Sequence, residues 1–421
     1  MTTPVDSPES KDTSPDAVPP PARPRRRRRW VRVLAGVTSL ALLAGAGVAW
    51  HLYRHLDGNI QTDTDTSREL LRVQSERPSA LPQATSAENI LLLGSDNRGG
   101  GNRGYGQDTG TQRSDTAILL HLAADRKTAT AVSLPRDLMV HIPSCRRPDG
   151  TMSNAQFAQF NWAFEFGGAA CTIRTVEKLT GIRVDHHLVV DFNGFKKMVD
   201  AVGGVEVCVP HDVHDRDAHL DLKAGRQVLH GEDALGYVRT RHGIGDGSDT
   251  QRIDRQQEFL ASLVKKVDSS GVLLNPAKLY PLLDAATSSL TADPGLDSLR
   301  ELYDLTQTLR RTPAGQVRFL TVPRRPYTPD PNRDELVQPA AEKLFTTLRE
   351  DGTVAVQEDD PGYGPGDSPS SGAGSSPGDR PGPGGTTSTA SASPSATGTA
   401  TDAPSYRGTT ADRDVCGGSG D

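Results

Sequence analysis

The chain has 421 residues, of which 35% are hydrophobic and 24% charged, and its formal net charge is −6. This composition excludes a collagen repeat, a coiled coil and a disulfide-stapled miniprotein, and it argues against a strongly basic nucleic-acid binder. The apolar content is below the usual ~45%, which indicates that unfolded segments dilute a globular part. Residues 1–29 carry seven basic and four acidic groups and residues 351–421 carry three basic and ten acidic groups, so both ends differ from the middle.

The N-terminal region predicts a membrane anchor. Residues 1–29 form a Pro- and Ser-rich basic tail that we expect to be disordered and cytoplasmic. An uncharged apolar stretch runs from Val33 to Trp50, close to the ~20 residues that cross a bilayer, so we expect a transmembrane helix over residues 30–53. Arginines on its N-terminal side predict a cytoplasmic N-terminus and an extracellular C-terminal part. A cleaved signal peptide is the alternative, because small residues occur around Ala46 to Ala49.

The elements that follow predict an α/β domain. Residues 54–86 are expected to be an extracellular linker. Short apolar runs predict strands over residues 89–93, 116–122, 128–134, 187–192, 205–209 and 316–322. Amphipathic spacing predicts helices over residues 155–166, 172–179, 194–201, 232–240, 250–267, 276–290, 296–310 and 334–348. Strands interleaved with helices predict a mixed central β-sheet flanked by helices, an α-β-α sandwich.

Composition also predicts the domain limits. We expect a main domain over residues 87–270, C-terminal helices and a strand that complete it over 271–350, and a disordered Gly/Ser/Pro/Thr tail over 351–421. Four cysteines suit an exported protein. Cys145 and Cys171 flank one Gly-containing excursion, so we expect a disulfide between them, with two reduced buried thiols as the alternative. Cys208 and Cys416 have no evident partner in the sequence.

Common catalytic motifs are missing from the sequence. Gly99, Gly101 and Gly104 have the spacing of a dinucleotide-binding loop, but the chain continues as loop from Tyr105 instead of opening a helix. No Walker A motif, H-E-x-x-H or G-x-S-x-G is present, which excludes the common NTPase, zincin and esterase classes.

Charged residues stand at the ends of three predicted strands. Asp96 follows the first strand, Arg113 and Asp115 precede the second, and Arg136 and Asp137 follow the third. Ligands of open α/β sheets bind beyond the strand ends. We therefore expect these side chains to converge on one rim of the sheet.

Two predicted helices add further charged residues. Arg239 and Arg241 end one helix, and Asp249, Arg252 and Gln256 open the next, where Arg252 and Gln256 share a face. Several guanidinium groups with two carboxylates match a diphosphate held through a divalent cation, because guanidinium binds phosphate bidentately and carboxylates suit Mg²⁺ or Mn²⁺. A surface ion pair explains each position taken singly.

Taken together, these motifs resemble the LytR-CpsA-Psr family of cell-envelope glycopolymer phosphotransferases, in its actinobacterial type. The chain departs from the family in a long Gly-rich insert between Arg98 and Arg113 and in having no recognisable C-terminal accessory domain. The resemblance extends from about residue 89 to 267 and rests on Asn89 to Arg98, Arg113 to Thr116, Ser133 to Asp137, Thr175 to Ile182, Asp200 to Val205, Gly231 to Arg241 and Asp249 to Gln257.

The resemblance implies a membrane-anchored, outward-facing enzyme. Such an enzyme moves a glycopolymer from a polyprenyl diphosphate carrier to a peptidoglycan hydroxyl and releases polyprenyl phosphate. The implied partners are a polyprenyl diphosphate-linked glycan, peptidoglycan and the membrane, with no nucleic acid, and the implied cofactor is Mg²⁺ (or Mn²⁺). A polyprenyl diphosphate hydrolase, or a non-catalytic envelope regulator that binds anionic lipid-linked polymer, is the alternative.

The resemblance also implies roles for individual residues. It makes Asp96 and Asp115 the metal ligands. Asp249 is the candidate general base for the acceptor hydroxyl, with a structural salt bridge to Arg252 or Arg241 as the alternative role. The implied catalytic arginines are Arg113, Arg136, Arg239 and Arg241, and the implied substrate-binding residues are Arg98, Arg252 and Gln256.

Overall fold

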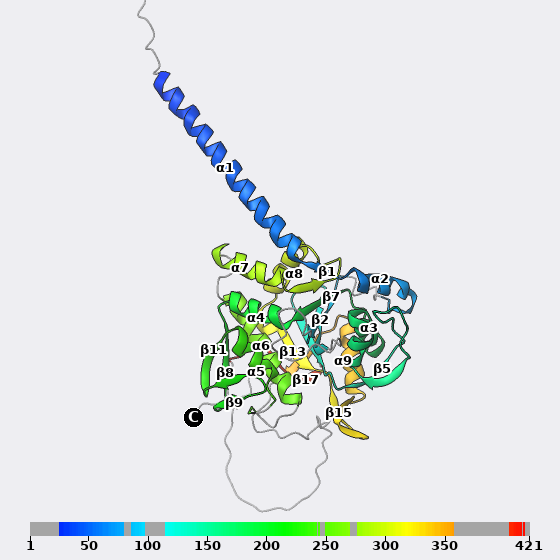
Figure 1. Ribbon diagram of the computed structural model, residues 1–421. Coiled ribbons are helices and arrows are strands. Elements are labelled where there is room, and N and C mark those ends of the chain that lie inside the picture. The colour runs from blue at the N-terminus through cyan, green and yellow to red at the C-terminus, as the bar shows by residue number, and fades with distance from the viewer. Residues whose placement is uncertain are drawn as a thin grey trace, which may run out of the picture. The chain divides into compact units, whose positions relative to one another are not determined.

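A computed structural model of the chain describes residues 25–79, 86–96, 114–241, 243–244, 249–269, 276–357, 404–414 and 416 (Figure 1). It divides into two compact units, residues 1–54 and residues 55–421. Helix α1 (Arg25–Asn59) carries the apolar segment. Its residues 30–59 are long and apolar enough to span a membrane, a property that signal sequences near an N-terminus share.

The second unit is built on a mixed sheet of nine strands among the described residues. The central strands β2, β3 and β4 are antiparallel to their neighbours in this trio, whereas β7 is parallel to β2 and β13 is parallel to β4. The prediction of a mixed central sheet is therefore confirmed. In spatial order the strands are β1 (Gln61–Thr62), β12 (Leu290–Ala292), β7 (His186–Asp191), β2 (Glu88–Ser95), β3 (Ser114–Leu122), β4 (Ala129–Leu134), β13 (Val317–Thr321), β17 (Ser405–Thr410) and β16 (Ala355–Gln357).

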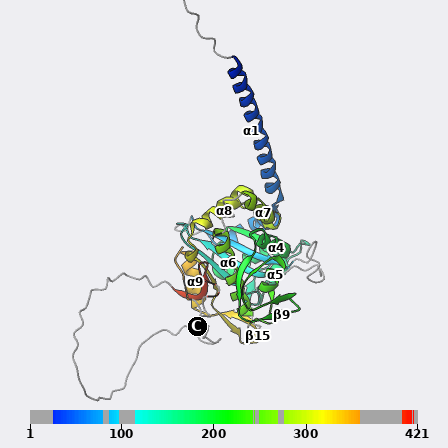
Figure 2. The ribbon, with the colours of Figure 1, turned by 90° about the vertical axis from the view of Figure 1, so that its left-hand side faces the viewer.

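Helices cover both faces of this sheet, as expected for an α-β-α sandwich (Figures 1 and 2). Successive strand residues point to opposite faces. Leu91 and Leu93 pack in one core with α2 (Thr64–Arg72), α3 (Trp162–Thr180) and α9 (Ala340–Arg349). Ile90 packs in the opposite core with α6 (Asp249–Ser269) and α8 (Leu299–Arg311).

A third apolar cluster lies beside the sheet. Buried Val205, Tyr237 and Phe259 are among its members. It joins α6 to α4 (Phe192–Ala201), α5 (Gly231–Arg239), α7 (Pro276–Thr287), and the hairpins β8 (Val205–Val209) with β11 (Gly225–Leu229) and β9 (Val213–Asp215) with β10 (Leu220–Leu222). Two more antiparallel hairpins are β5 (Met139–Ile142) with β6 (Gln156–Gln159) and β14 (Arg324–Tyr327) with β15 (Asp330–Leu336).

Two predicted helices begin in the wrong place. Within residues 155–166, Gln156–Gln159 is strand β6, and the helix starts only at Trp162. Within residues 334–348, the first residues belong to β15, and α9 starts at Ala340. In both cases the residues pair with the preceding strand in an antiparallel hairpin, and these hydrogen bonds outweigh local helical spacing.

The linker prediction for residues 54–86 is wrong for residues 55–79. Strand β1 pairs with β12, and Leu70 of α2 is buried in the core. Arg77 donates to both carboxylate oxygens of Glu177 at 2.7–3.1 Å, and both side chains are almost fully buried. This segment is therefore part of the folded domain.

The prediction of a disordered tail over residues 351–421 is wrong for its described parts. β16 lies within the predicted tail, and β17 pairs with both β13 and β16. Cys416 forms a disulfide with Cys208, a pairing that the sequence did not reveal. The predicted disulfide between Cys145 and Cys171 is confirmed. Residues 358–403 lie outside the described residues.

Candidate active site

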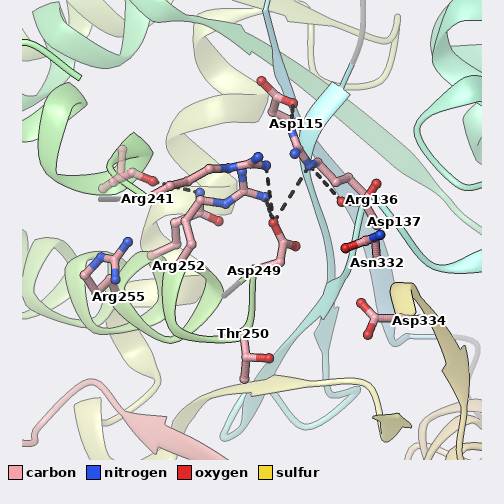
Figure 3. Close-up of polar contacts among 12 residues, drawn as sticks. Asp115, Arg136, Asp137, Arg241, Asp249, Thr250, Arg252, Arg255, Asn332 and Asp334 are labelled. Atoms are coloured by element: carbon pink, nitrogen blue, oxygen red, sulfur yellow. Dashed lines mark hydrogen bonds and ion pairs between the residues drawn. The ribbon is translucent and has the colours of Figure 1, made fainter. Parts of the chain in front are cut away.

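Site residues from three predicted segments meet at one rim of the sheet, where β4 ends and both β3 and α6 begin (Figure 3). Asp115 comes from β3, Arg136 follows β4, and Asp249 is the first residue of α6. Together with Arg252 and Gln256 they line a narrow cleft of about 10 Å³. The expected convergence at one rim is therefore present for Asp115, Arg136 and Asp137.

A β-bulge sets the position of Asp115. Gly94 pairs with Thr116 and Ser95 pairs with Ser114, so Asp115 is an extra residue without an opposite partner on β2. Such a bulge redirects a side chain from the regular alternation of the strand. The Asp115 carboxylate accepts a 2.8 Å hydrogen bond from the Arg136 guanidinium.

Asp249 lies at the centre of an arginine cluster. Its Oδ1 is 2.5 Å from Arg252, 3.6 Å from Arg241 and 3.8 Å from Arg136. Figure 3 shows Arg241 and Arg252 on one side of this carboxylate and Arg136 on the other. Neither Asp249 oxygen makes a hydrogen bond of regular geometry to any described residue, although both are buried. The salt bridges that the sequence left as an alternative role are thus present.

Burial and charge act in opposite directions on the two innermost arginines. Burial disfavours the charged form of Arg136, but the carboxylates of Asp115, Asp137 and Asp249 outweigh it and raise its pKa. Burial lowers the pKa of Arg252, and nearby Arg136 adds to this effect while Asp249 opposes it. Arginine remains protonated in proteins, so the cluster holds its positive charge at a cost in desolvation.

Polar anchors fix the first turns of α6. Gln257 is buried and donates to Ser133 and Thr321 at the ends of β4 and β13, at 3.0 and 2.9 Å. Gln256 donates to the carbonyl of Val238 at 3.0 Å, which joins α6 to the end of α5. These contacts hold Asp249 and Arg252 over the rim of the sheet. The sequence assigned Gln256 to substrate and did not assign Gln257 any role.

Arg239 and Arg241 have different surroundings. The Arg241 guanidinium points toward Asp249, as described above. The Arg239 guanidinium lies 4.5 Å from the centroid of the Phe192 ring, at the start of α4. A cation over an aromatic face is held there electrostatically. The structure therefore brings Arg241 into the cluster and positions Arg239 through an aromatic contact.

The C-terminal hairpin β14–β15 adds residues that sequence reasoning missed. Arg333 donates to Asp137 at 3.3 Å, and Arg324 donates to Asp334 at 2.6 Å and to Thr250 at 2.5 Å. Burial raises the pKa of Asp334, and the charges of Asp249 and Asp137 add to this effect against the opposing Arg324. The only signal in the sequence was the density of charge around residues 324–325 and 332–335.

The metal-site prediction can be compared only in part with the structure. Among the described residues, no three His, Cys, Asp or Glu side chains are grouped to hold a metal ion. Asp96 follows β2, and Asp115 lies on the bulge of the adjacent β3. Two carboxylates suit Mg²⁺, which takes one or two protein ligands and completes its shell with waters and phosphate oxygens. Arg98 and Arg113 lie outside the described residues.

A larger cavity of about 600 Å³ lies beside the rim, between α2, α3 and the ends of β2 and β7. It combines apolar residues such as Phe164 and Val189 with charged residues such as Arg68 and Arg146. The sequence did not predict this mixed lining.

Comparison with known proteins identifies the family. The LytR_cpsA_psr family model matches residues 53–350. LcpB of Corynebacterium glutamicum, a probable cell wall biosynthesis protein, is 35% identical over 281 residues, which cover 65% of this chain and 63% of LcpB. TagT of Bacillus subtilis, a polyisoprenyl-teichoic acid–peptidoglycan teichoic acid transferase, is 30% identical over 251 residues, which cover 58% of this chain and 72% of TagT.

A solved structure supports the same relationship. It is described as a LytR-Csp2A-Psr enzyme from Actinomyces oris, with a TM-score of 0.50 and 25% identity, and the similarity covers 65% of this chain and 93% of that one. The chain spans less than two thirds of the length of LcpB. The family model, however, matches well over half of the chain, including the sheet strands from β1 to β13 and the arginine cluster. The chain therefore belongs to the LytR-CpsA-Psr family.

Proposed function

We propose that this protein is a phosphotransferase that moves a glycopolymer from a polyprenyl diphosphate carrier to a hydroxyl of peptidoglycan. The observation that carries the proposal is the convergence of Arg136, Arg241 and Arg252 on the buried carboxylate of Asp249. Guanidinium groups gathered around one point bind an anion with several oxygens, and a diphosphate is such an anion. The similarity to TagT, a polyisoprenyl-teichoic acid–peptidoglycan teichoic acid transferase, supports this substrate class.

In the proposed reaction the acceptor hydroxyl attacks the phosphorus that carries the glycopolymer. A new O–P bond forms, the P–O bond to the departing polyprenyl phosphate breaks, and Asp249 takes the hydroxyl proton. The arginines stabilise the charge that develops on the transferred and departing groups. Because the cleft is narrow, the arginine side chains must turn from Asp249 to the diphosphate as it binds, and this movement frees the Asp249 carboxylate to act as the base.

A divalent cation fits this proposal. Asp96 and Asp115 would hold Mg²⁺ (or Mn²⁺), which would neutralise diphosphate charge and favour departure of the leaving group. Asp115 also orients Arg136 through their 2.8 Å hydrogen bond.

The apolar helix supports a membrane location. We propose that residues 30–53 anchor the chain with the N-terminus in the cytoplasm and the folded domain outside. The test is protease digestion of intact cells from which the wall has been removed. Protection of the folded domain from external protease would reject this orientation.

The function is tested with the full-length protein in lipid nanodiscs, a polyprenyl diphosphate-linked glycopolymer and nascent peptidoglycan. We expect Arg136→Ala and Arg252→Ala each to lower transfer by about 10²-fold or more, because donors to a developing anion contribute on this scale. Arg300→Ala is the matched control, since Arg300 is exposed on α8 and its pair with Asp304 is 4.0 Å long. Normal transfer by both site variants would reject the assignment.

Product analysis separates the alternatives. Covalent attachment of the polymer to peptidoglycan identifies the transferase. Release of free phosphorylated polymer in place of attachment identifies a hydrolase, and binding of the lipid-linked polymer without any product identifies a regulator.

A further inference from the structure

Three ring-bearing side chains form a surface that the proposed chemistry does not use. The His141 and Phe157 rings have centroids 4.9 Å apart, and the Phe157 and Tyr327 rings have centroids 6.1 Å apart. His141 lies on β5, Phe157 on β6 and Tyr327 on β14. We call these three residues the aromatic platform.

The aromatic platform lies on the outer face of its hairpin. His141 is exposed and pairs directly with Phe157, which is 45% exposed. Their neighbours Val140 and Ala158 are 2% and 5% exposed and face the core. Core packing therefore accounts for Val140 and Ala158 but not for a phenylalanine that faces solvent and contacts two other rings.

The platform is continuous with the candidate active site. Asp137 lies in the turn that precedes β5, Met139 begins this strand, and Met139 and His141 lie on the same face of it. Between the site and the platform, Gln159 pairs with Met139 and accepts hydrogen bonds from Arg333 when its amide oxygen faces that guanidinium. Arg333 also contacts Asp137.

Polar groups border this path on its other side. Asn332 is exposed within β15, and Figure 3 places it beside Asp137 and Asp334. The charges nearby are already balanced within the protein, since Arg333 pairs with Asp137 and Arg325 pairs with Glu335 at 2.8 Å. A ligand on this path therefore needs apolar faces for the rings and neutral polar groups for Gln159 and Asn332, and it needs no net charge.

A chain of neutral pyranose rings has this chemistry. The C–H face of a sugar ring packs on aromatic rings, and its hydroxyl and N-acetyl groups pair with side-chain amides. An anionic glycopolymer would instead call for an excess of positive charge along this path, where carboxylates match the arginines. Charge complementarity thus favours the glycan strand of the acceptor over the donor polymer.

We propose that the aromatic platform of His141, Phe157 and Tyr327 binds sugar rings of the peptidoglycan glycan strand and leads that strand to the Asp137–Asp249 site. This inference rests on the proposed function, because it assigns an acceptor site to the same reaction.

Cosedimentation of the full-length protein in detergent with purified peptidoglycan freed of attached polymer tests the inference without requiring transfer. We expect Phe157→Ala and Tyr327→Ala each to weaken binding about tenfold, the scale of a central aromatic contact. Phe157→Trp keeps an aromatic face and is expected to restore binding. Tyr303→Ala is the matched control, because Tyr303 is 53% exposed on α8, and it is expected to bind like wild type.

A parallel assay measures binding of lipid-linked glycopolymer in vesicles. The inference is overturned if both alanine variants bind peptidoglycan as well as the wild-type protein does. It is also overturned if the wild-type protein itself does not bind peptidoglycan. A loss confined to lipid-linked glycopolymer assigns the platform to the donor and also overturns it. Platform-dependent binding of peptidoglycan by a protein that transfers nothing supports the acceptor surface and rejects only the transferase assignment.

Discussion

At the scale of single residues, Asp249 has a structural role and a proposed catalytic role. Its carboxylate lies against three guanidinium groups in a buried cleft, and we propose that the same carboxylate acts as the base. Without the Asp249 carboxylate, Arg252 would remain charged and buried but would lack its strongest stabilising partner. The residue therefore contributes both to stability and to the proposed chemistry.

We expect Asp249→Asn to lower transfer by about 10²-fold or more and to lower stability, because the variant keeps the shape of the side chain but removes its charge and its basicity. The measurements are transfer to peptidoglycan and urea unfolding. Thr250→Val provides a neighbouring control that affects only the contact with Arg324. A fully active Asp249→Asn protein would exclude Asp249 as the base.

The pair of His186 and Asp293 makes a pH-dependent contribution to stability. The hydrogen bond between His186 and Asp293 raises the pKa of His186 above 6.5. Burial favours the neutral form of Asp293, but His186 and backbone donors outweigh it and lower its pKa below 3.8. The contribution of His186 is complete below pH 6.5 and is lost as pH rises through its raised pKa. The contribution of Asp293 is complete above pH 3.8 and is lost as pH falls through its lowered pKa.

The pair should therefore stabilise the fold most between pH 3.8 and pH 6.5. We expect His186→Asn to destabilise the protein clearly at about pH 5 and much less at about pH 9, as measured by denaturant unfolding at each pH. His121 is a useful contrast, because burial lowers its pKa against the opposing charge of Asp351, so its contribution weakens as pH falls below 6.5. An equal loss at both pH values would show that the effect of His186 is not electrostatic.

At the scale of elements, residues 55–79 illustrate how a polar segment becomes part of a core. The segment has a buried strand partner and a buried ion pair, and neither is visible from composition. Arg77 satisfies Glu177 with two parallel hydrogen bonds and also donates to the carbonyl of Val184 at 2.7 Å. This end of the domain therefore depends on a segment that directly follows the apolar helical segment in sequence.

Removal of Arg77 should leave Glu177 buried without its partner. We expect Arg77→Ala to lower the free energy of unfolding by about 3 kcal/mol, the scale of a broken buried pair. Arg68→Ala breaks an exposed pair with Asp65 and should cost less than about 1 kcal/mol. Urea denaturation of the two variants measures the difference. Equal effects would mean that residues 55–79 are not packed as described.

The C-terminal strand β17 is a second element whose partners are distant in sequence. It completes the sheet beside β13, and Arg407 pairs with Asp254 of α6 at 3.0 Å. The Cys208–Cys416 disulfide then links the segment to β8. The C-terminal segment that contains β17 therefore supports α6, the helix that carries Asp249 and Arg252.

We expect the double variant Cys208→Ser, Cys416→Ser to lower the free energy of unfolding by about 2–4 kcal/mol, because loss of a native disulfide frees the unfolded chain. Ser405→Ala, at an exposed position of β17, should have no measurable effect. Denaturation under non-reducing conditions tests both variants. An unchanged midpoint for the double variant would show that β17 is held by the sheet alone.

At the scale of the whole molecule, the low apolar fraction of the chain has a structural account. The sheet has apolar cores on both faces, and the polar composition belongs largely to the ends of the chain. A connected group of ion pairs lies at the rim where β3, β4, α6 and β15 meet. The fold thus separates its apolar layers from one charged edge.

Local sequence determined the N-terminal apolar helix, the central strands, most helices, the Cys145–Cys171 bridge and the family motifs, because each depends on residues close in the chain or on a short excursion. Only the tertiary structure decided that Asp249 balances three arginines, that Gln257 anchors α6 and that residues 324–336 border the site. It alone also placed residues 55–79 and 404–416 in the domain. These features depend on pairings across tens to hundreds of residues, such as Arg324 with Thr250 and Cys208 with Cys416, and no local pattern of polarity encodes a partner at that separation.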